Sequence, residues 1–215
     1  MLFDYTDISD LTAKNQLSVP ARQELGMLDQ KLLKHPGDID SLLQKGFVLF
    51  QNHLDGQAIA TFEQVLELDS KCAEAYIWLA ELLLFHWSDG ANAKLVLGRL
   101  LEFNPESAEG AYLLACAYQR EDDQVEYERL LMVAIQMDQT LIMPRFCLVS
   151  LLLEQGRIVL AKLELEQLEL QIKPGLVAKG SREDYWETMI TGRILTPFIQ
   201  NKLKDFRRFN YFHDR

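Results

Sequence analysis

The feature of this sequence that most restricts its fold is a helix–turn–helix pattern that begins at Ile39. Across residues 39–52 the apolar side chains recur three and four positions apart, which is the spacing of a helix with one buried face. The segment His53–Gly56 interrupts this spacing, and a second helical stripe starts at Ala58. The pattern therefore predicts two short antiparallel helices joined by a tight turn, with Asp38 as the N-cap of the first.

The same pattern returns three times along the chain, and two positions define its register. A small position in the first helix is occupied by Gly46, Ala80, Ala115 and Val149, at intervals of 34, 35 and 34 residues. A large position in the second helix is occupied by Phe62, Leu97, Leu131 and Leu165, at intervals of 35, 34 and 34 residues. We expect the small residues to let the two helices approach each other, with Phe62 filling the space beside Gly46.

A helix–turn–helix of this period resembles the tetratricopeptide repeat (TPR). Four units fit the pattern, over residues 39–72, 73–107, 108–141 and 142–174. The resemblance implies an all-α fold, a TPR-like right-handed superhelix of antiparallel helix pairs, with atypical capping helices at its two ends.

The segments outside the four units are expected to cap or extend the repeat. Residues 1–19 are predicted to form an N-terminal arm, and residues 20–38 a leading capping helix with Pro20 in its first turn. Residues 175–215 are predicted to form a C-terminal capping helix and a basic-aromatic tail. Alternatively, this helix folds into the groove of the repeat and is displaced by ligand. The tail is expected to dock on the cap, with partner binding, self-association and nucleic-acid stacking as alternatives.

Two departures from the repeat predict local changes in geometry. The second unit carries one extra residue within 86–90, so we expect an altered turn there. The third unit has Tyr127 at the position where the other units have a close-contact alanine, so we expect its two helices to splay apart.

Composition restricts the function classes that the chain can serve. A formal net charge of −10 argues against general nucleic-acid binding, which needs a basic face. No apolar run approaches the length of a membrane span, and the first ten residues do not have the pattern of a secretory signal. Cys72, Cys116 and Cys147 lie in predicted helices without metal-like spacing, as expected for thiols in a reducing compartment. We therefore expect an acidic cytoplasmic protein.

No motif in the sequence indicates catalysis. Phosphate-binding glycine loops, dinucleotide fingerprints and zinc-binding spacings are all absent from the sequence. The four histidines, His35, His53, His86 and His213, fall at predicted helix ends, in turns or in the tail, where capping and surface roles are expected. We accordingly expect no enzyme activity, no cofactor and no metal site.

The TPR resemblance implies that the first helix of each pair lines a concave groove. The residues that it assigns to a partner-binding site there are Leu43, Phe47, Phe50, Ile77, Trp78, Glu81, Phe85, Tyr112, Cys116 and Phe146. A basic clamp of the kind that holds chaperone C-termini in one TPR subclass is absent, because its matching positions are Leu43, Phe47, Trp78, Glu109 and Leu113. An aromatic groove edged by carboxylates would suit an apolar or basic-amphipathic segment of a partner. The alternative for each ring is a place in the core between helices.

The leading functional hypothesis is a non-catalytic scaffold or chaperone-like adaptor that binds a protein segment. In its layout and charge the chain is loosely similar to small TPR secretion chaperones. Under this hypothesis, truncating Phe47 and Trp78 together removes partner binding and leaves the thermal melt nearly unchanged. The alternative is a structural subunit that forms a homo-oligomer through its C-terminal helix and tail, which light scattering of full-length and truncated chains would detect.

Overall fold

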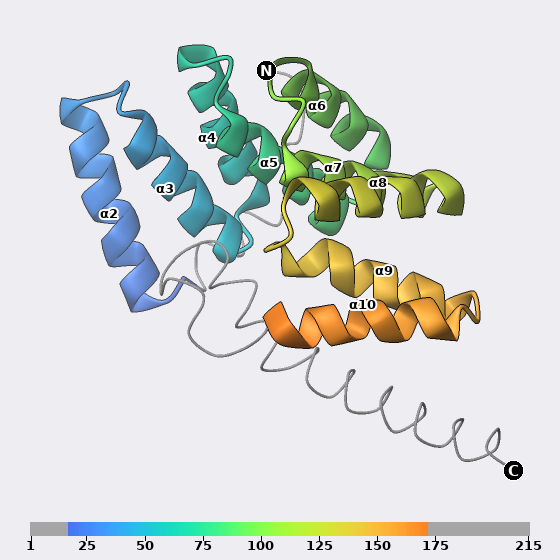
Figure 1. Ribbon diagram of the computed structural model, residues 1–215. Helices are drawn as coiled ribbons and strands as arrows, with labels where there is room; N and C mark the ends of the chain where they lie inside the picture. Colours follow the sequence, from blue (N-terminus) through green and yellow to red (C-terminus); the bar gives the residue numbers. More distant parts are fainter. Residues whose placement is uncertain (1–16, 172–215) are drawn as a thin grey trace, which may run out of the picture. The chain divides into compact units, whose positions relative to one another are not determined.

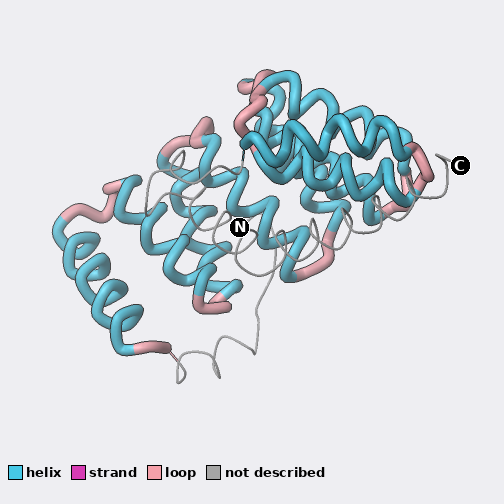
Figure 2. Tube along the Cα trace, turned by 60° about the horizontal axis from the view of Figure 1, so that its bottom comes forward, coloured by secondary structure: helices cyan, strands magenta, loops and turns pink. Residues whose placement is uncertain are grey.

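The structure is a computed structural model that describes residues 17–171 of the chain. Within these residues all regular structure is helical (Figure 2). The chain divides into two compact units, Met1–Leu141 and Ile142–Arg215. The helices of the first unit are α2 (Val19–Lys34), α3 (Ile39–Gln51), α4 (Asp55–Leu68), α5 (Ala73–Glu81), the π-helix η2 (Leu82–His86), α6 (Gly90–Phe103), α7 (Ala108–Arg120) and α8 (Gln124–Met137) (Figure 1). The second unit contains α9 (Ile142–Glu154) and α10 (Ile158–Gln171).

The helices pack as antiparallel pairs in chain order. Helices α3 and α4 pack against each other, as do α5 and α6, α7 and α8, and, in the second unit, α9 and α10. Each pair lies within one of the four residue ranges that the repeat spacing gives. The predicted contact inside the first pair is confirmed, because the ring of Phe62 lies against the backbone of Gly46.

The leading helix α2 covers one side of the first pair. Ser18 caps it by accepting a hydrogen bond from the backbone N–H of Ala21 at 3.3 Å, and Pro20 lies in its first turn, as predicted. Ala21 and Leu28 pack with Val48 of α3 in a small apolar cluster. This helix therefore shields part of α3 from solvent.

Each helix pair turns through one residue with a left-handed backbone. These residues are His53 (φ 57°), Ser88 (φ 55°) and Asp122 (φ 61°) in the first unit and Gly156 (φ 71°) in the second. At the first turn the N–H of His53 donates to the carbonyl of Phe50 at 3.1 Å and the N–H of Leu54 to that of Leu49 at 3.0 Å. This is the Schellman arrangement, whose left-handed position favours glycine because a Cβ is strained there.

The extra residue of the second unit is accommodated in η2. The N–H of Trp87 donates to the carbonyl of Leu82 at 3.1 Å, and the N–H of Asp89 donates to that of Leu83 at 2.7 Å. These bonds reach back five and six residues, whereas an α-helix reaches back four. The prediction of an altered turn at this point is thus confirmed.

The prediction that the third pair splays apart is wrong. Helices α7 and α8 pack closely along their lengths, and Tyr127 is buried between its neighbours with 4% of its surface exposed. Many of the buried residues of α7 are small, Gly110, Ala111, Ala115 and Ala117 among them, so a buried tyrosine in the next helix is compatible with a closely packed pair.

The second unit has a core of its own. Val149 of α9 packs with Leu165 and Leu168 of α10. Beside this core the guanidinium of Arg145, which is buried, forms an ion pair with Glu164. Gly156 supplies the left-handed turn between the two helices.

Residues 1–16 and 172–215 lie outside the described part of the chain, and so do most of the expected arm, the C-terminal helix and the basic-aromatic tail. The last residues expected in the arm, Ser18 and Val19, form the N-cap and the first residue of α2. Among the described helices, none is both long enough and apolar enough to cross a membrane.

Candidate functional site: the face of the inner helices

The first helices of successive pairs are neighbours in the first unit. Helix α3 contacts α5 and α5 contacts α7, whereas the described second helices α4, α6 and α8 do not pack closely on one another. When the first helices of neighbouring pairs lie closer together than the second helices, the stack of pairs is curved, and the first helices lie on its concave side. We call the surface that α3, α5 with η2, and α7 present on this side the inner-helix face.

Four of the residues that the sequence assigned to the groove lie on these helices with accessible surface. Leu43, Phe47 and Tyr112 are half-buried, and Phe85 in η2 is 43% exposed. A fifth, Phe146, is half-buried on α9 of the second unit, where it packs against the Val149 core. Their part in partner binding stays a prediction.

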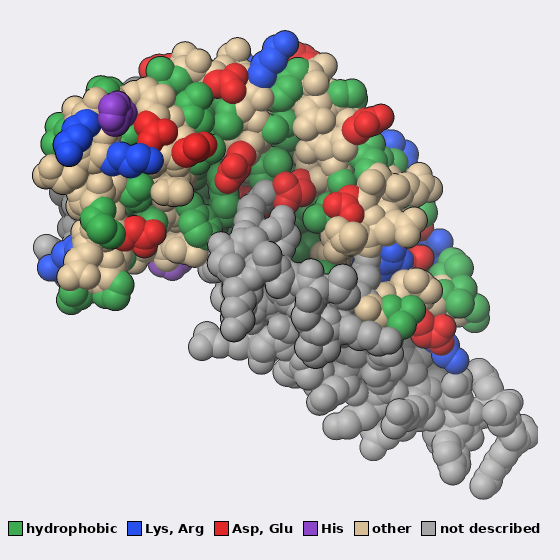
Figure 3. Space-filling model, turned by 60° about the vertical axis from the view of Figure 1, so that its left-hand side comes forward, with side chains coloured by type: hydrophobic (Ala, Val, Ile, Leu, Met, Phe, Trp, Pro, Cys, Tyr) green, Lys and Arg blue, Asp and Glu red, His purple; other side chains and the backbone are tan. Residues whose placement is uncertain are grey.

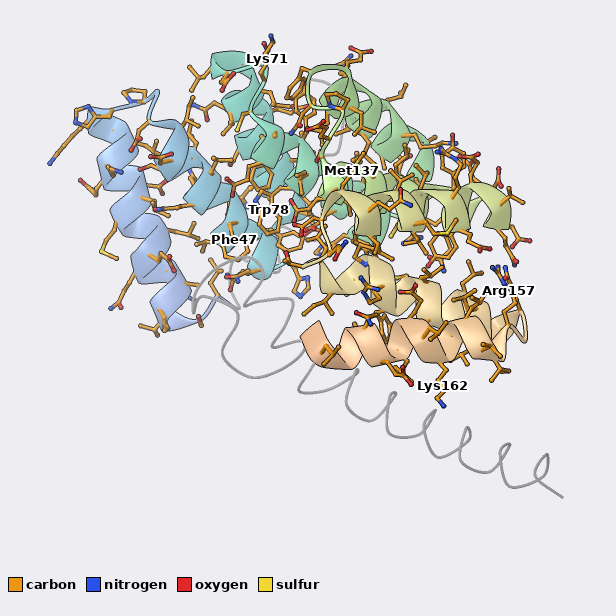
Figure 4. All side chains as sticks on the ribbon, viewed as in Figure 1. Phe47, Lys71, Trp78, Met137, Arg157 and Lys162 are labelled. Carbon is orange, nitrogen blue, oxygen red and sulfur yellow. The ribbon has the colours of Figure 1, made fainter. Side chains whose placement is uncertain are left out.

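The other five assigned residues are buried rather than exposed: Phe50, Ile77, Trp78, Glu81 and Cys116. Trp78 is the clearest case, with 2% of its surface exposed. Trp78 lies beside Phe47 (Figure 4), with 4.9 Å between their ring centroids. The ring centroids of Phe50 and Phe62 lie 5.2 Å and 6.3 Å from that of Trp78. Its indole N–H donates to Oε1 of Glu74 at 3.3 Å.

Trp78 therefore joins the first two helix pairs as part of the core. The physical reason is that residues 75–84 are apolar at every position except Glu81, and all of them are buried. The expectation that truncating Phe47 and Trp78 leaves the melt nearly unchanged must be corrected, since removing a buried indole creates a large cavity.

Each inner helix carries an acidic residue in its first turn. These residues are Asp40 of α3, Glu74 of α5 and Glu109 of α7. A carboxylate at this place is stabilised by the positive end of the helix dipole. Acidic side chains lie among hydrophobic ones on the face of the molecule drawn in Figure 3.

Asp38, the N-cap residue of α3, serves a different purpose from the one predicted. Its carboxylate accepts no capping bond from a backbone N–H of the helix; it pairs with Nζ of Lys31 at 2.7 Å and accepts from the Ser41 hydroxyl at 2.6 Å. The hydrogen bonds from Lys31 and Ser41 hold the pKa of Asp38 below its ordinary value. This contact ties the end of α2 to the start of α3.

One cluster of side chains was missed by sequence reasoning. His53 and Asp55, at the α3–α4 turn, meet His86 at the end of η2, and one ligand-type atom from each lies within 4.8 Å of the others. The only signals in the sequence were the extra residue near His86 and a histidine at a turn position that favours glycine.

The sequence matches no protein-family model and no curated protein. In structure it is similar to TTC0263, a thermophilic TPR protein of Thermus thermophilus, with a TM-score of 0.61 and 19% identity over 71% of this chain and 83% of that chain. It is also similar to YrrB, a TPR protein with an unusual peptide-binding site, with a TM-score of 0.53 and 19% identity over 69% and 76% of the two chains.

A third solved structure, PilW, a widely conserved type IV pilus biogenesis factor, has a TM-score of 0.64 and 12% identity over 97% of this chain and 96% of that chain. These similarities and the helix pairs described above define the class: the chain is a TPR-like protein with an all-α fold. The fold class that the repeat spacing predicted is confirmed. At this level of identity the likeness concerns the fold.

Proposed function

We propose that the protein is a non-catalytic scaffold whose inner-helix face binds a segment of a partner protein. The observation that carries the proposal is the combination of apolar and acidic groups on the same helices. Leu43, Phe47, Phe85 and Tyr112 supply apolar contact area, and the first turns of α3, α5 and α7 each supply a carboxylate.

The chemistry of this face favours one kind of segment. Aromatic anchors at protein interfaces typically contribute a few kcal/mol each when truncated, about 2 or more at the strongest positions. Carboxylates beside them attract lysine and arginine and repel an acidic peptide. The net charge of −10 acts in the same direction. We therefore propose a basic-amphipathic segment as the ligand, held as a helix or an extended strand along the inner helices.

The finer proposal is a chaperone-like adaptor, in which the bound segment belongs to a client that exposes it before assembly or export. The peptide-binding site of YrrB supports protein binding by a related fold, and does not identify a ligand for this chain.

The test is selection of peptides from a display library that contains basic-amphipathic, neutral and acidic sequences, followed by fluorescence-anisotropy titration on the full chain. We expect basic-amphipathic peptides to be enriched and their affinity to fall with added salt. Enrichment of acidic peptides, or no saturable binding, would contradict the proposal.

Variants locate the binding surface. Phe85→Ala and Tyr112→Ala should weaken peptide binding by about tenfold or more. The matched control is Leu95→Ala, because Leu95 is 64% exposed on α6, a second helix. Equal losses in the three variants would place the binding site elsewhere.

A further inference from the structure

The cluster at the α3–α4 turn joins two consecutive repeats through polar groups. His86 contacts the Asp55 carboxylate, with 2.9 Å from its Nδ1 to each carboxylate oxygen. The ring of His53 lies beside that of His86, with 5.5 Å between centroids. Among the described residues, this is the one group of three or more histidine, cysteine or acidic side chains whose ligand atoms lie close enough to share an ion.

Two of the three side chains in the cluster are shielded from solvent, and the third is exposed. Asp55 is 9% exposed, and its position at the first residue of α4 fixes its backbone. The His86 ring stacks on Phe50, with 4.9 Å between centroids and 20° between planes. His53 is exposed, so an ion can reach the cluster from solvent.

His53 occupies a backbone position that a histidine fills at a cost. It has φ 57° at the left-handed residue of the Schellman turn, where a Cβ is strained by roughly 1–2 kcal/mol relative to the right-handed conformation. The fourth unit has glycine at the same position, Gly156. Ser88 and Asp122 hold the same conformation in the second and third units, so it is a property of the turn, and the histidine at this position is what distinguishes the first unit.

The π-helix brings the third group into the cluster. One residue added to a helix rotates everything after it by about 100°. His86 is the last residue of η2, so its direction depends on the extra residue that this unit carries and the other units lack. Single π-helical turns inside α-helices are frequently found at functional sites.

We propose that His53, Asp55 and His86 form a site for a divalent transition-metal ion of the Zn²⁺ type, linking the first and second repeats. Two imidazoles and a carboxylate suit Zn²⁺ and its neighbours in the first row, whereas Mg²⁺ and Ca²⁺ prefer oxygen ligands. Three protein ligands leave one position of a tetrahedral site for water. This inference is independent of the peptide-binding proposal.

The distances require only small movements. Ligands about 2.0–2.1 Å from a tetrahedral zinc lie about 3.3 Å apart. The ligand atoms here lie within 4.8 Å of one another, and rotation of the exposed His53 ring can close the difference. A metal ion on Nδ1 of His86 requires that nitrogen to be unprotonated, so the ring proton then lies on Nε2.

The experiment is isothermal titration of the metal-free full chain with ZnCl₂, with thermal melts in EDTA and in zinc. We expect saturable 1:1 binding and a higher melting temperature in zinc. Cobalt titration should give the absorption spectrum of a tetrahedral site that contains nitrogen and oxygen ligands.

Three variants decide whether the cluster is the site. His53→Gly keeps the left-handed turn and removes one ligand, while Asp55→Asn and His86→Gln remove the others with little change in size. Each should lower zinc affinity by at least about tenfold. The matched control is His35→Ala, at the exposed end of α2, which should bind zinc like the unaltered chain. The proposal would be overturned if each of the three single variants bound zinc as tightly as the unaltered chain, or if the unaltered chain showed no saturable binding.

Discussion

The aromatic ring of Phe62 lies directly over the backbone of Gly46. A Cβ built on Gly46 would lie 2.4 Å from Cε1 of Phe62 and 2.6 Å from its Cζ. Phe62 is completely buried, and its ring stacks on that of Trp78, so moving it would disturb the core between the first two helix pairs. The close approach of α3 and α4 therefore depends on the absence of a side chain at residue 46.

Gly46→Ala should destabilise the protein. Overpacking a closed core costs about 1–3 kcal/mol, often more than the roughly 1 kcal/mol that alanine gains over glycine inside a helix. We expect a net loss of about 1 kcal/mol or more in the free energy of unfolding, measured by urea denaturation followed by circular dichroism.

Gly98→Ala is the control for Gly46→Ala. Gly98 lies inside α6 and a Cβ there would meet nothing within 4 Å, so this change should stabilise the protein by about 0.5–1 kcal/mol. Equal stabilities of the two variants would show that the Gly46–Phe62 contact does not restrict the helix pair.

Trp78→Ala should cost about 3–5 kcal/mol in the free energy of unfolding, because it removes a buried indole that contacts Phe47, Phe50 and Phe62. Leu95→Ala, on an exposed side chain, should change it by less than about 0.5 kcal/mol. Urea denaturation of the two variants measures the difference. If the Trp78→Ala chain is as stable as the Leu95→Ala chain, Trp78 lies on the surface, as the sequence predicted, and not in the core.

The repeat could be predicted from sequence because its cause is local. Apolar spacing and one small residue such as Gly46 decide which faces of a helix pair meet, and both are visible within one unit. The prediction at Tyr127 was wrong because the size of one residue does not decide how closely two helices pack: α7 buries several small residues, and the pair stays close with Tyr127 buried.

The orientation of α5 was not predictable by this reasoning. Residues 75–84 are apolar at nearly every position, so no single apolar face is visible in the sequence. The helical period therefore does not show which side chains face the core and which lie on the inner-helix face. The cluster was hidden for another reason: Asp55 and His86 lie 31 residues apart, and a π-helical turn decides the direction of His86. The spacing of apolar residues does not show how one additional residue in a turn changes the direction of a side chain.

Cys72 should react slowly with alkylating agents at neutral pH. Burial favours the neutral thiol and raises the pKa of Cys72 above its ordinary value, against the opposing hydrogen bond from the N–H of Ala75. The measurement is the rate of alkylation by iodoacetamide, quantified by mass spectrometry of the Cys72 peptide. In the denatured chain this rate should level off above the ordinary thiol pKa of about 8.5, whereas in the native chain it should still increase with pH there.

The same shift has a sign for stability. Because the folded pKa of Cys72 lies above the unfolded one, its contribution to stability is complete below about pH 8.5 and is lost as the pH rises toward the folded pKa. Identical pH profiles for alkylation of the native and denatured chains would contradict the burial of the thiol.

His53→Gly should have opposite effects on stability with and without metal. In EDTA the variant should be more stable than the unaltered chain by up to about 1 kcal/mol, because glycine relieves the left-handed strain at φ 57°. Asp122→Gly is the comparison, since Asp122 has φ 61° in the equivalent turn and lies outside the cluster.

In zinc at 100 times the dissociation constant, binding should stabilise the unaltered chain by about 2.7 kcal/mol, and the His53→Gly variant, whose affinity is weaker, by much less. The order of the two stabilities should therefore reverse between EDTA and zinc, whereas Asp122→Gly should keep its order in both. Thermal and urea unfolding of the three chains in both buffers measures this. If His53→Gly is the more stable in both buffers, the strain at His53 is real and zinc does not bind through its ring.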